Sequence, residues 1–84
     1  MNYRVIIEEV VKKQIRKLPI NDAKRVLIAV YGLSTDPYVG KKLHGEFDGF
    51  WSFRVWPFRI IYEIQKKELI VFVVKVGHRR DVYR

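Results

Sequence analysis

Three runs of β-branched and aromatic residues follow one another with almost no interruption in the second half of the chain. They span Phe50–Val55, Phe58–Ile64 and Leu69–Val76, and the joints between them are centred on Trp56-Pro57 and Lys66-Lys67. Joints this short connect antiparallel strands, because a parallel crossover needs a dozen or more residues. The sequence therefore predicts a three-stranded antiparallel meander.

The first half of the chain carries one strand pattern and then two helical patterns. Tyr3–Glu8 alternates in the manner of a strand, and Glu9–Leu18 places apolar residues at helical spacing until a proline ends the helix. A second helix begins near Asn21 or Asp22, either of which can cap it, and stops at Gly32. The residues expected to face inward from this helix are Val26, Leu27, Val30 and Tyr31.

The expected fold class is α+β, with the order strand, helical hairpin and meander. The helices should pack on one face of a four-stranded sheet. The chain has 84 residues, no cysteine and 49% hydrophobic residues, so we expect one domain over residues 1–84 that is stabilised by its core. The longest apolar run, Leu69 to Val74, is far too short to cross a bilayer, and we expect a cytoplasmic protein with no membrane partner.

Register decides which side chains share a face of the meander. A hairpin centred on Trp56-Pro57 places Arg54 directly opposite Arg59, and one centred on Lys66-Lys67 places Arg59 opposite Val74. The face expected to be covered by the helices carries Trp51, Phe53, Val55, Phe58, Ile60, Tyr62, Ile64, Leu69, Val71 and Val73. The opposite face carries Ser52, Arg54, Arg59, Ile61, Glu63, Phe72 and Val74, and continued alternation adds His78 and Arg80.

Two arginines directly across a strand pair repel each other unless an anion lies between them. A phosphate suits Arg54 and Arg59, because the guanidinium fork matches its oxygens and stays charged. The alternatives are that Glu63 neutralises the pair or that both side chains extend into water. The whole chain favours a polyanion such as nucleic acid, because 17 Lys and Arg against 9 Asp and Glu give a net charge of +8.

The chemistry open to this chain is metal-free and cofactor-free. Paired carboxylates, a glycine-rich phosphate loop and a metal-ligand cluster are missing from the sequence, which leaves Arg, Tyr and His. RNA cleavage suits these groups, because the 2′-hydroxyl is an internal nucleophile that needs only orientation, proton transfer and charge stabilisation. The residues expected to contact RNA outside the reacting centre are Lys41, Lys42, His44, Arg80 and Arg84.

Several stretches of the chain resemble the RelE/ParE superfamily of type II toxin-antitoxin toxins, and its RelE-like branch in particular. They are Lys42-Leu43-His44-Gly45, Phe50-Trp51-Ser52-Phe53-Arg54-Val55, Phe58-Arg59-Ile60-Ile61-Tyr62-Glu63-Ile64 and the closing Phe72-Val73-Val74-Lys75-Val76-Gly77-His78-Arg79-Arg80-Asp81-Val82-Tyr83. The resemblance implies an endoribonuclease that enters the ribosomal A site and cleaves mRNA through the 2′-hydroxyl, inhibiting translation. It also implies a cognate RelB-like antitoxin, held in a hetero-oligomeric complex.

Carried over by position, the resemblance also implies roles for individual residues. Arg54 matches a basic residue of the central strand, and Arg59 matches the arginine that holds the scissile phosphate. Arg79, with Arg80 as the alternative, matches a transition-state arginine, and Tyr83 matches the tyrosine that orients the base.

One departure from the family pattern keeps other interpretations open. Some RelE-type toxins carry a second basic residue where this chain has Ser52, which leaves three alternatives for the proton acceptor: His78, Arg54 assisted by its neighbours, or no efficient base at all. A ParE-like inhibitor of DNA gyrase without enzymatic activity is the chief alternative. A catalytically decayed homologue that only binds antitoxin is the other. The tail with His78, Arg79, Arg80 and Tyr83 favours the RNA interpretation.

Overall fold

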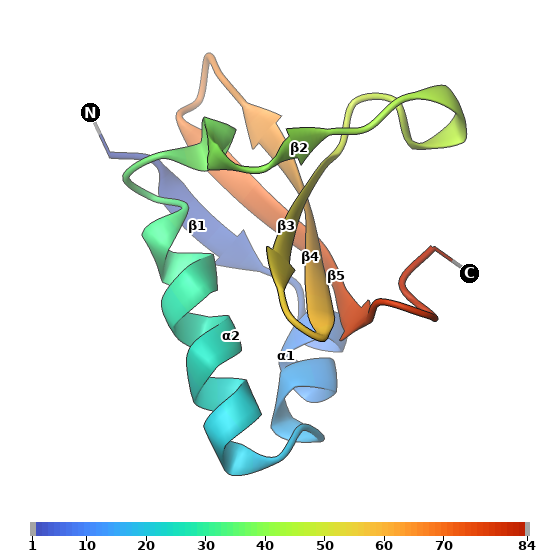
Figure 1. The fold of residues 1–84 in the computed structure, drawn as a ribbon. Coiled ribbons are helices and arrows are strands. Elements are labelled where there is room, and N and C mark those ends of the chain that lie inside the picture. Colours follow the sequence, from blue (N-terminus) through green and yellow to red (C-terminus); the bar gives the residue numbers. More distant parts are fainter. Residues whose placement is uncertain (1, 84) are drawn as a thin grey trace.

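The fold is α+β, with two helices packed against a five-stranded mixed sheet (Figure 1). The structure is a computed structural model that describes residues 2–83. The elements are β1 (Arg4–Ile7), α1 (Glu9–Arg16), α2 (Ile20–Gly32), β2 (Lys41–Lys42), β3 (Trp51–Val55), β4 (Phe58–Gln65) and β5 (Ile70–His78), with 3₁₀ turns at Pro37–Val39 and Gly45–Phe47. The strand order is β1-β5-β4-β3-β2.

The predicted meander is confirmed, and the sheet is one strand wider than predicted. β3, β4 and β5 pair antiparallel in succession, and β1 pairs parallel with β5. The additional strand is β2, in which Lys41 and Lys42 pair with the start of β3. A two-residue strand of exposed lysines has no hydrophobic alternation, so it carries none of the pattern by which strands are recognised in a sequence.

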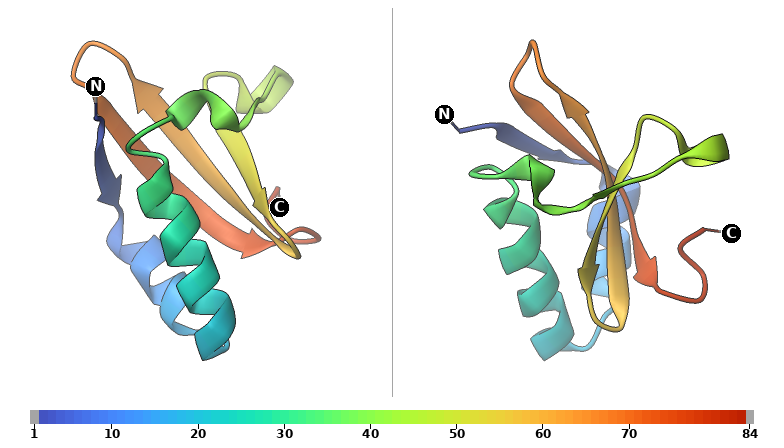
Figure 2. Two further views of the ribbon diagram at one scale, coloured as in Figure 1. Left: turned by 60° about the vertical axis from the view of Figure 1, so that its left-hand side comes forward. Right: turned by 45° about the horizontal axis from the view of Figure 1, so that its top comes forward.

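Both helices cover one face of the sheet, and the core lies between the two layers. The loop around Gly45–Phe47 and the described residues after β5 lie on the other side of the sheet, as the right-hand view of Figure 2 shows. The buried core cluster consists of Val11, Ile15, Val26, Val30, Leu33, Phe58, Ile60, Tyr62, Val71, Val73 and Val76. Of the residues predicted for the covered face, all except Leu69 belong to this cluster or pack against it. Neither described helix has the length and apolarity needed to span a membrane.

The helix predictions hold for the elements and fail in three details. α1 ends at Arg16, two residues before the predicted Leu18. α2 ends at Gly32 as expected, but it begins at Ile20, so Asn21 and Asp22 lie inside its first turn and neither caps it. The Asp22 carboxylate instead accepts a hydrogen bond from Arg25 Nη2 at 3.0 Å. Tyr31, expected to face inward, is 58% exposed, because it lies at the margin of the buried stripe of the helix.

The register between β4 and β5 differs from the predicted one. Arg59 lies opposite Gly77 rather than Val74. The first cause is a longer turn: Gln65 pairs with Ile70, and Leu69 lies in the turn with φ 55° instead of in the core strand. The second cause is a β-bulge, since Ile61 pairs with Lys75 while Tyr62 pairs with Val73, which leaves Val74 as the extra residue.

The bulge exchanges the two faces of the second half of β5. Each residue beyond it points to the side opposite from that given by strict alternation. Val76 therefore joins the core, and its N–H donates to the Gln14 side-chain oxygen at 3.0 Å, which ties the bulged strand to α1. His78 pairs with Phe58 on the helix side of the sheet, so the prediction that it shares a face with the arginines is wrong. Lys75 takes the opposite side.

Candidate functional site

The predicted arginine pair is present on the face of the sheet that the helices do not cover. Arg54 of β3 and Arg59 of β4 are direct cross-strand partners. Arg54 is exposed and Arg59 half-buried, and within residues 2–83 neither guanidinium has an ion-pair partner. The proposed neutralisation by Glu63 is wrong, because the described contact of its carboxylate is a hydrogen bond from Gln65 Nε2 at 3.0 Å. Two unneutralised cations therefore face each other across the ladder.

Four residues on neighbouring strands form a row next to this arginine pair. The arginine pair and the row lie on the same face of the sheet, which we call the tail face because the end of the described chain folds over it. Lys41 pairs with Ser52, Ser52 with Ile61 and Ile61 with Lys75, so one row crosses β2, β3, β4 and β5. A lysine stands at each end of the row. Ser52 and Ile61 in the middle are buried, at 4% and 5% exposure. The tail face thus has a buried centre, formed by Ser52 and Ile61, with cations on either side.

A shallow cavity of about 270 Å³ lies at the β2 side of the tail face. Its lining residues are Val39, Gly40, Lys41, Ser52, Phe53, Arg54 and Arg59. The Ser52 hydroxyl is buried without a described hydrogen-bond partner. Three cations around one depression give it a positive potential that favours an anionic ligand.

The residues after β5, which we call the tail (residues 79–83), fold back over the tail face. The His78 carbonyl accepts hydrogen bonds from the N–H groups of Asp81 and Val82, at 2.8 and 3.1 Å. This turn directs Val82 onto Gly77, where a Cβ at Gly77 would lie 3.9 Å from the Val82 backbone. Val82 is consequently 1% exposed. The tail is anchored by one buried side chain.

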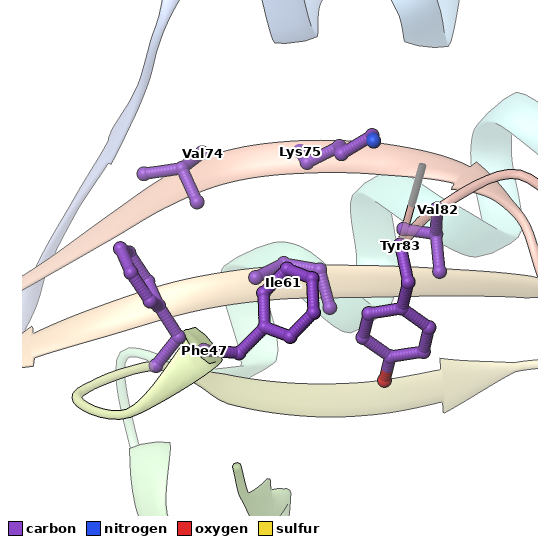
Figure 3. Close-up of a pocket in the computed structure, with 7 residues that line it drawn as sticks. Phe47, Ile61, Val74, Lys75, Val82 and Tyr83 are labelled. Atoms are coloured by element: carbon purple, nitrogen blue, oxygen red, sulfur yellow. The ribbon is translucent and has the colours of Figure 1, made fainter. Parts of the chain in front are cut away.

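Anchoring of Val82 brings Tyr83 over a second and more apolar cavity, which we call the tail pocket. Figure 3 shows Tyr83 of the tail and Phe47 of the 3₁₀ turn Gly45–Phe47 at this cavity. The centroids of their rings lie 5.2 Å apart in an edge-to-face arrangement. The pocket has a volume of about 330 Å³ and is lined by Phe47, Phe50, Ile61, Val74, Lys75, Val82 and Tyr83. A cavity of this volume can hold a small aromatic ligand, and aromatic side chains form part of its walls.

The other predicted catalytic residues are not all brought to this face. His78 lies edge-to-face with Phe58 at 6.2 Å, and its Nδ1 accepts a hydrogen bond from the Arg80 N–H at 3.2 Å. The Arg79 guanidinium lies 4.7 Å from the centre of the Trp56 ring, at the tip of the β3–β4 hairpin. A cation over an indole face is held there by the ring quadrupole. Arg79 therefore lies at the tip of the β3–β4 hairpin, and His78 stabilises the turn of the tail through its hydrogen bond with Arg80.

The residues predicted to contact RNA also do not all lie on the tail face. Lys41 faces the arginine side of the sheet as the partner of Ser52, whereas Lys42 pairs with Trp51 and faces the helix side. His44 lies exposed just before the 3₁₀ turn Gly45–Phe47, and Arg80 lies exposed in the tail. Arg84, also predicted to contact RNA, lies outside the described residues.

Behind the arginines the sheet is fixed by a buried tyrosine. The Tyr62 hydroxyl donates to the Pro37 carbonyl at 2.7 Å, which joins the centre of β4 to the segment before β2. Burial raises the pKa of Tyr62 to about 12. Gly40 is required beside it, because a Cβ there would collide with the Tyr62 hydroxyl and lie 2.8 Å from the Ser52 carbonyl oxygen. This contact sets the position of β2, and with it Lys41.

Sequence reasoning missed Lys75 and Phe47, which both line the tail pocket. A signal for Lys75 was present: strict alternation from Val71 and Val73 assigns the next core position to a lysine. A charged residue at a core position argues for a change of register, because its burial is costly. Phe47 lies in an irregular loop, where the sequence has no periodic pattern from which the direction of a side chain can be predicted.

Three comparisons place the chain among known proteins. Residues 5–83 match the family model described as ParE toxin of type II toxin-antitoxin system, parDE. The chain is 34% identical to Toxin RelG of Mycobacterium tuberculosis, over 100% of this chain and 99% of that protein.

Solved structures give the same grouping. The toxin-antitoxin complex RelBE2 of Mycobacterium tuberculosis contains a chain that is 30% identical, with a TM-score of 0.87 over 94% of this chain and 100% of that one. The archaeal RelE–RelB complex of Pyrococcus horikoshii contains one at 27% identity, with a TM-score of 0.83 over 98% of this chain and 100% of that one.

Proposed function

The chain belongs to the RelE/ParE superfamily of type II toxin-antitoxin toxins, and we propose that it is a ribosome-dependent endoribonuclease. Its substrate is mRNA in the ribosomal A site, which it cleaves by 2′-hydroxyl attack without a metal ion, so that translation stops. The observation that carries the proposal is the unneutralised pair Arg54 and Arg59 on the tail face. Like charges directly opposite destabilise a sheet, and a phosphate between them removes that repulsion.

In the proposed reaction the O2′–P bond forms as the P–O5′ bond breaks. The products are a 2′,3′-cyclic phosphate and a 5′-hydroxyl. Arg54 and Arg59 bind the scissile phosphate and stabilise the additional negative charge of the phosphorane. A guanidinium is a donor only and stays protonated, so these residues act by charge and not as bases. The 2′-hydroxyl proton passes to solvent beside the exposed Arg54, and solvent returns a proton to O5′.

The remaining site residues position the RNA. Tyr83, held by the buried Val82, stacks on a base next to the cleaved bond. Lys41 contacts an adjacent phosphate from the far side of the cavity. Arg79 supplies positive charge at the hairpin end, where it is held by the Trp56 ring and by the hydrogen bond from its N–H to the Pro57 carbonyl. Arg80 adds a cation in the tail, and His78 positions it by accepting a hydrogen bond from its N–H.

The proposed partners are the ribosome with its mRNA and a RelB-like antitoxin. The antitoxin is supported by the relatives, since two similar solved structures are toxin-antitoxin complexes, RelBE2 and archaeal RelE–RelB. The matching family model is named for ParE, which keeps gyrase inhibition as the second candidate function. The two are separable, because an endoribonuclease cuts mRNA, whereas a gyrase inhibitor stops replication and induces the DNA-damage response.

The test is primer extension on a reporter mRNA in a translating extract, with wild type, Arg59→Ala and Arg16→Ala compared. We expect discrete cuts inside the reading frame that need ribosomes, persist in Arg16→Ala and vanish in Arg59→Ala. Arg16 is an exposed cation of α1, so its removal lowers the net charge by the same amount away from the tail face. Thermal melts establish that both variants are folded. Absence of cutting by folded wild-type protein would refute the enzyme, and arrest with a DNA-damage response would then favour gyrase inhibition.

A further inference from the structure

The tail pocket combines aromatic walls with one charged group among the residues that the structure describes. Phe47, Phe50 and Tyr83 supply the rings. Among the described residues that line the pocket, Lys75 is the one with a charged side chain. A phosphate is poorly matched to a cavity of this kind, because most of its wall cannot donate a hydrogen bond. A flat ring with polar atoms on one edge is well matched to it.

Lys75 reaches this pocket because of the bulge in β5. Strict alternation would direct it into the helix-covered core, and the extra residue Val74 turns it to the tail face instead. Bulges near binding sites commonly re-aim one side chain in this way. In Figure 3 the Lys75 side chain extends along β5 toward Val82 and Tyr83, and its Nζ lies 3.5 Å from the Asp81 carbonyl oxygen. The ammonium group of Lys75 thus lies beside the tail, at the side of the pocket that Val82 and Tyr83 line.

The position of the pocket relative to the arginines suits one nucleotide of a bound strand. Lys75 and Ile61 are cross-strand partners, and Ile61 lies two positions along β4 from Arg59 on the same face. A phosphate at Arg54 and Arg59 therefore leaves the adjoining base beside Ile61 and beneath Tyr83. Stacking on aromatic rings is tolerant of base identity, so the polar group in the pocket decides which base is preferred.

We propose that Lys75 is a specificity-determining residue that contacts the edge of the base in the tail pocket and selects guanine over adenine. An ammonium group donates hydrogen bonds and accepts none. The guanine edge presents the acceptors O6 and N7, whereas adenine presents an amino group where guanine has O6. The inference rests on the proposed endoribonuclease function and adds to it the chemistry by which the site chooses where to cut.

The experiment uses ribosomes programmed with short synthetic mRNAs that differ at one base. Guanine, inosine and adenine are placed in turn at each position of the A-site codon, and the cleavage rate is measured. Inosine keeps O6 and N7 and lacks the 2-amino group, so it isolates the edge that Lys75 is proposed to contact. We expect wild type to cut guanine and inosine about tenfold faster than adenine at one codon position.

Three variants test the assignment to Lys75. Lys75→Gln should abolish the preference, because an amide both donates and accepts and so tolerates adenine. Lys75→Arg should retain it, because arginine also pairs with O6 and N7. Lys67→Gln removes an exposed cation from the β4–β5 turn and should change nothing. Melting temperatures are compared for all three, and binding of the antitoxin is measured in parallel.

Each result decides between the two proposals. An unchanged base preference in folded Lys75→Gln, alongside cutting that depends on Arg59, would overturn base selection and leave the endoribonuclease standing. Equal cutting of guanine and adenine by wild type would do the same, as would complete loss of cutting in folded Lys75→Gln. Weaker antitoxin binding with an unchanged preference would make the pocket a protein docking site. No cutting by wild type would overturn both proposals.

Discussion

Replacing Arg54 by glutamine should stabilise the folded protein while destroying its activity. Arg54 and Arg59 are direct cross-strand partners without a described counter-ion, and a like-charge pair of this kind costs about 0.5 kcal/mol. Because Arg54 is exposed, solvent screening keeps the figure at this small size. For a chain of 84 residues, about 0.5 kcal/mol corresponds to a rise in Tm of roughly 2–4 °C. The cleavage rate should fall on the order of a hundredfold, because one donor to the phosphorane is lost.

The assay is thermal unfolding at low and high salt, with Lys24→Gln as the matched control. Lys24 is an exposed cation of α2, so its replacement lowers the net charge equally without touching the pair, and lysine and glutamine have similar helix propensities. The additional gain of Arg54→Gln over Lys24→Gln should be present at about 0.01 M salt and disappear near 1 M, where the Debye length is about 3 Å. A variant that is less stable than the control at low salt would refute the repulsion argument, whatever its activity.

Other consequences of the structure concern the tail, the core and the buried tyrosine. Val82→Ala should destabilise the protein by about 2 kcal/mol in urea unfolding, and should slow cleavage more than Val71→Ala, the same change at an equally buried core valine, because Tyr83 loses its anchor. Ile60→Ala should cost about 3 kcal/mol or more, since Ile60 is fully buried; unchanged melting would mean that the assignment of the covered face is wrong. Tyr62 has a folded-state pKa of about 12, above its ordinary value of 10.0, so its contribution is complete below pH 10 and is lost as the pH rises through about 12. Stability measured between these limits should therefore fall more steeply in wild type than in Tyr62→Phe.

The sequence was sufficient for the two helices, for four of the five strands and for the arginine pair, and insufficient for β2 and for the far half of β5. The tight joint at Trp56-Pro57 leaves one register for β3 and β4, and the observed pairing of Arg54 with Arg59 follows from it. The second hairpin has a longer turn, in which Leu69 adopts a left-handed conformation that is uncommon for leucine. Leu69, which follows the charged residues Lys66, Lys67 and Glu68, resembles the start of a strand, because nothing in its side chain indicates the backbone conformation it adopts.

The bulge had a stronger signature, and it is the feature on which the candidate site depends. Val71 and Val73 are two positions apart, as alternation requires, whereas Val73 and the next buried valine, Val76, are three positions apart. Lys75 is the residue that alternation would bury. One inserted residue resolves both problems, because it places Val76 in the core and turns Lys75 to the opposite face. The same insertion moves His78 to the helix side, where it organises the turn that seats Val82. The exchange of a lysine for a histidine on the tail face is thus a single structural event, and it gives the pocket beneath Tyr83 the ammonium group of Lys75 as a hydrogen-bond donor.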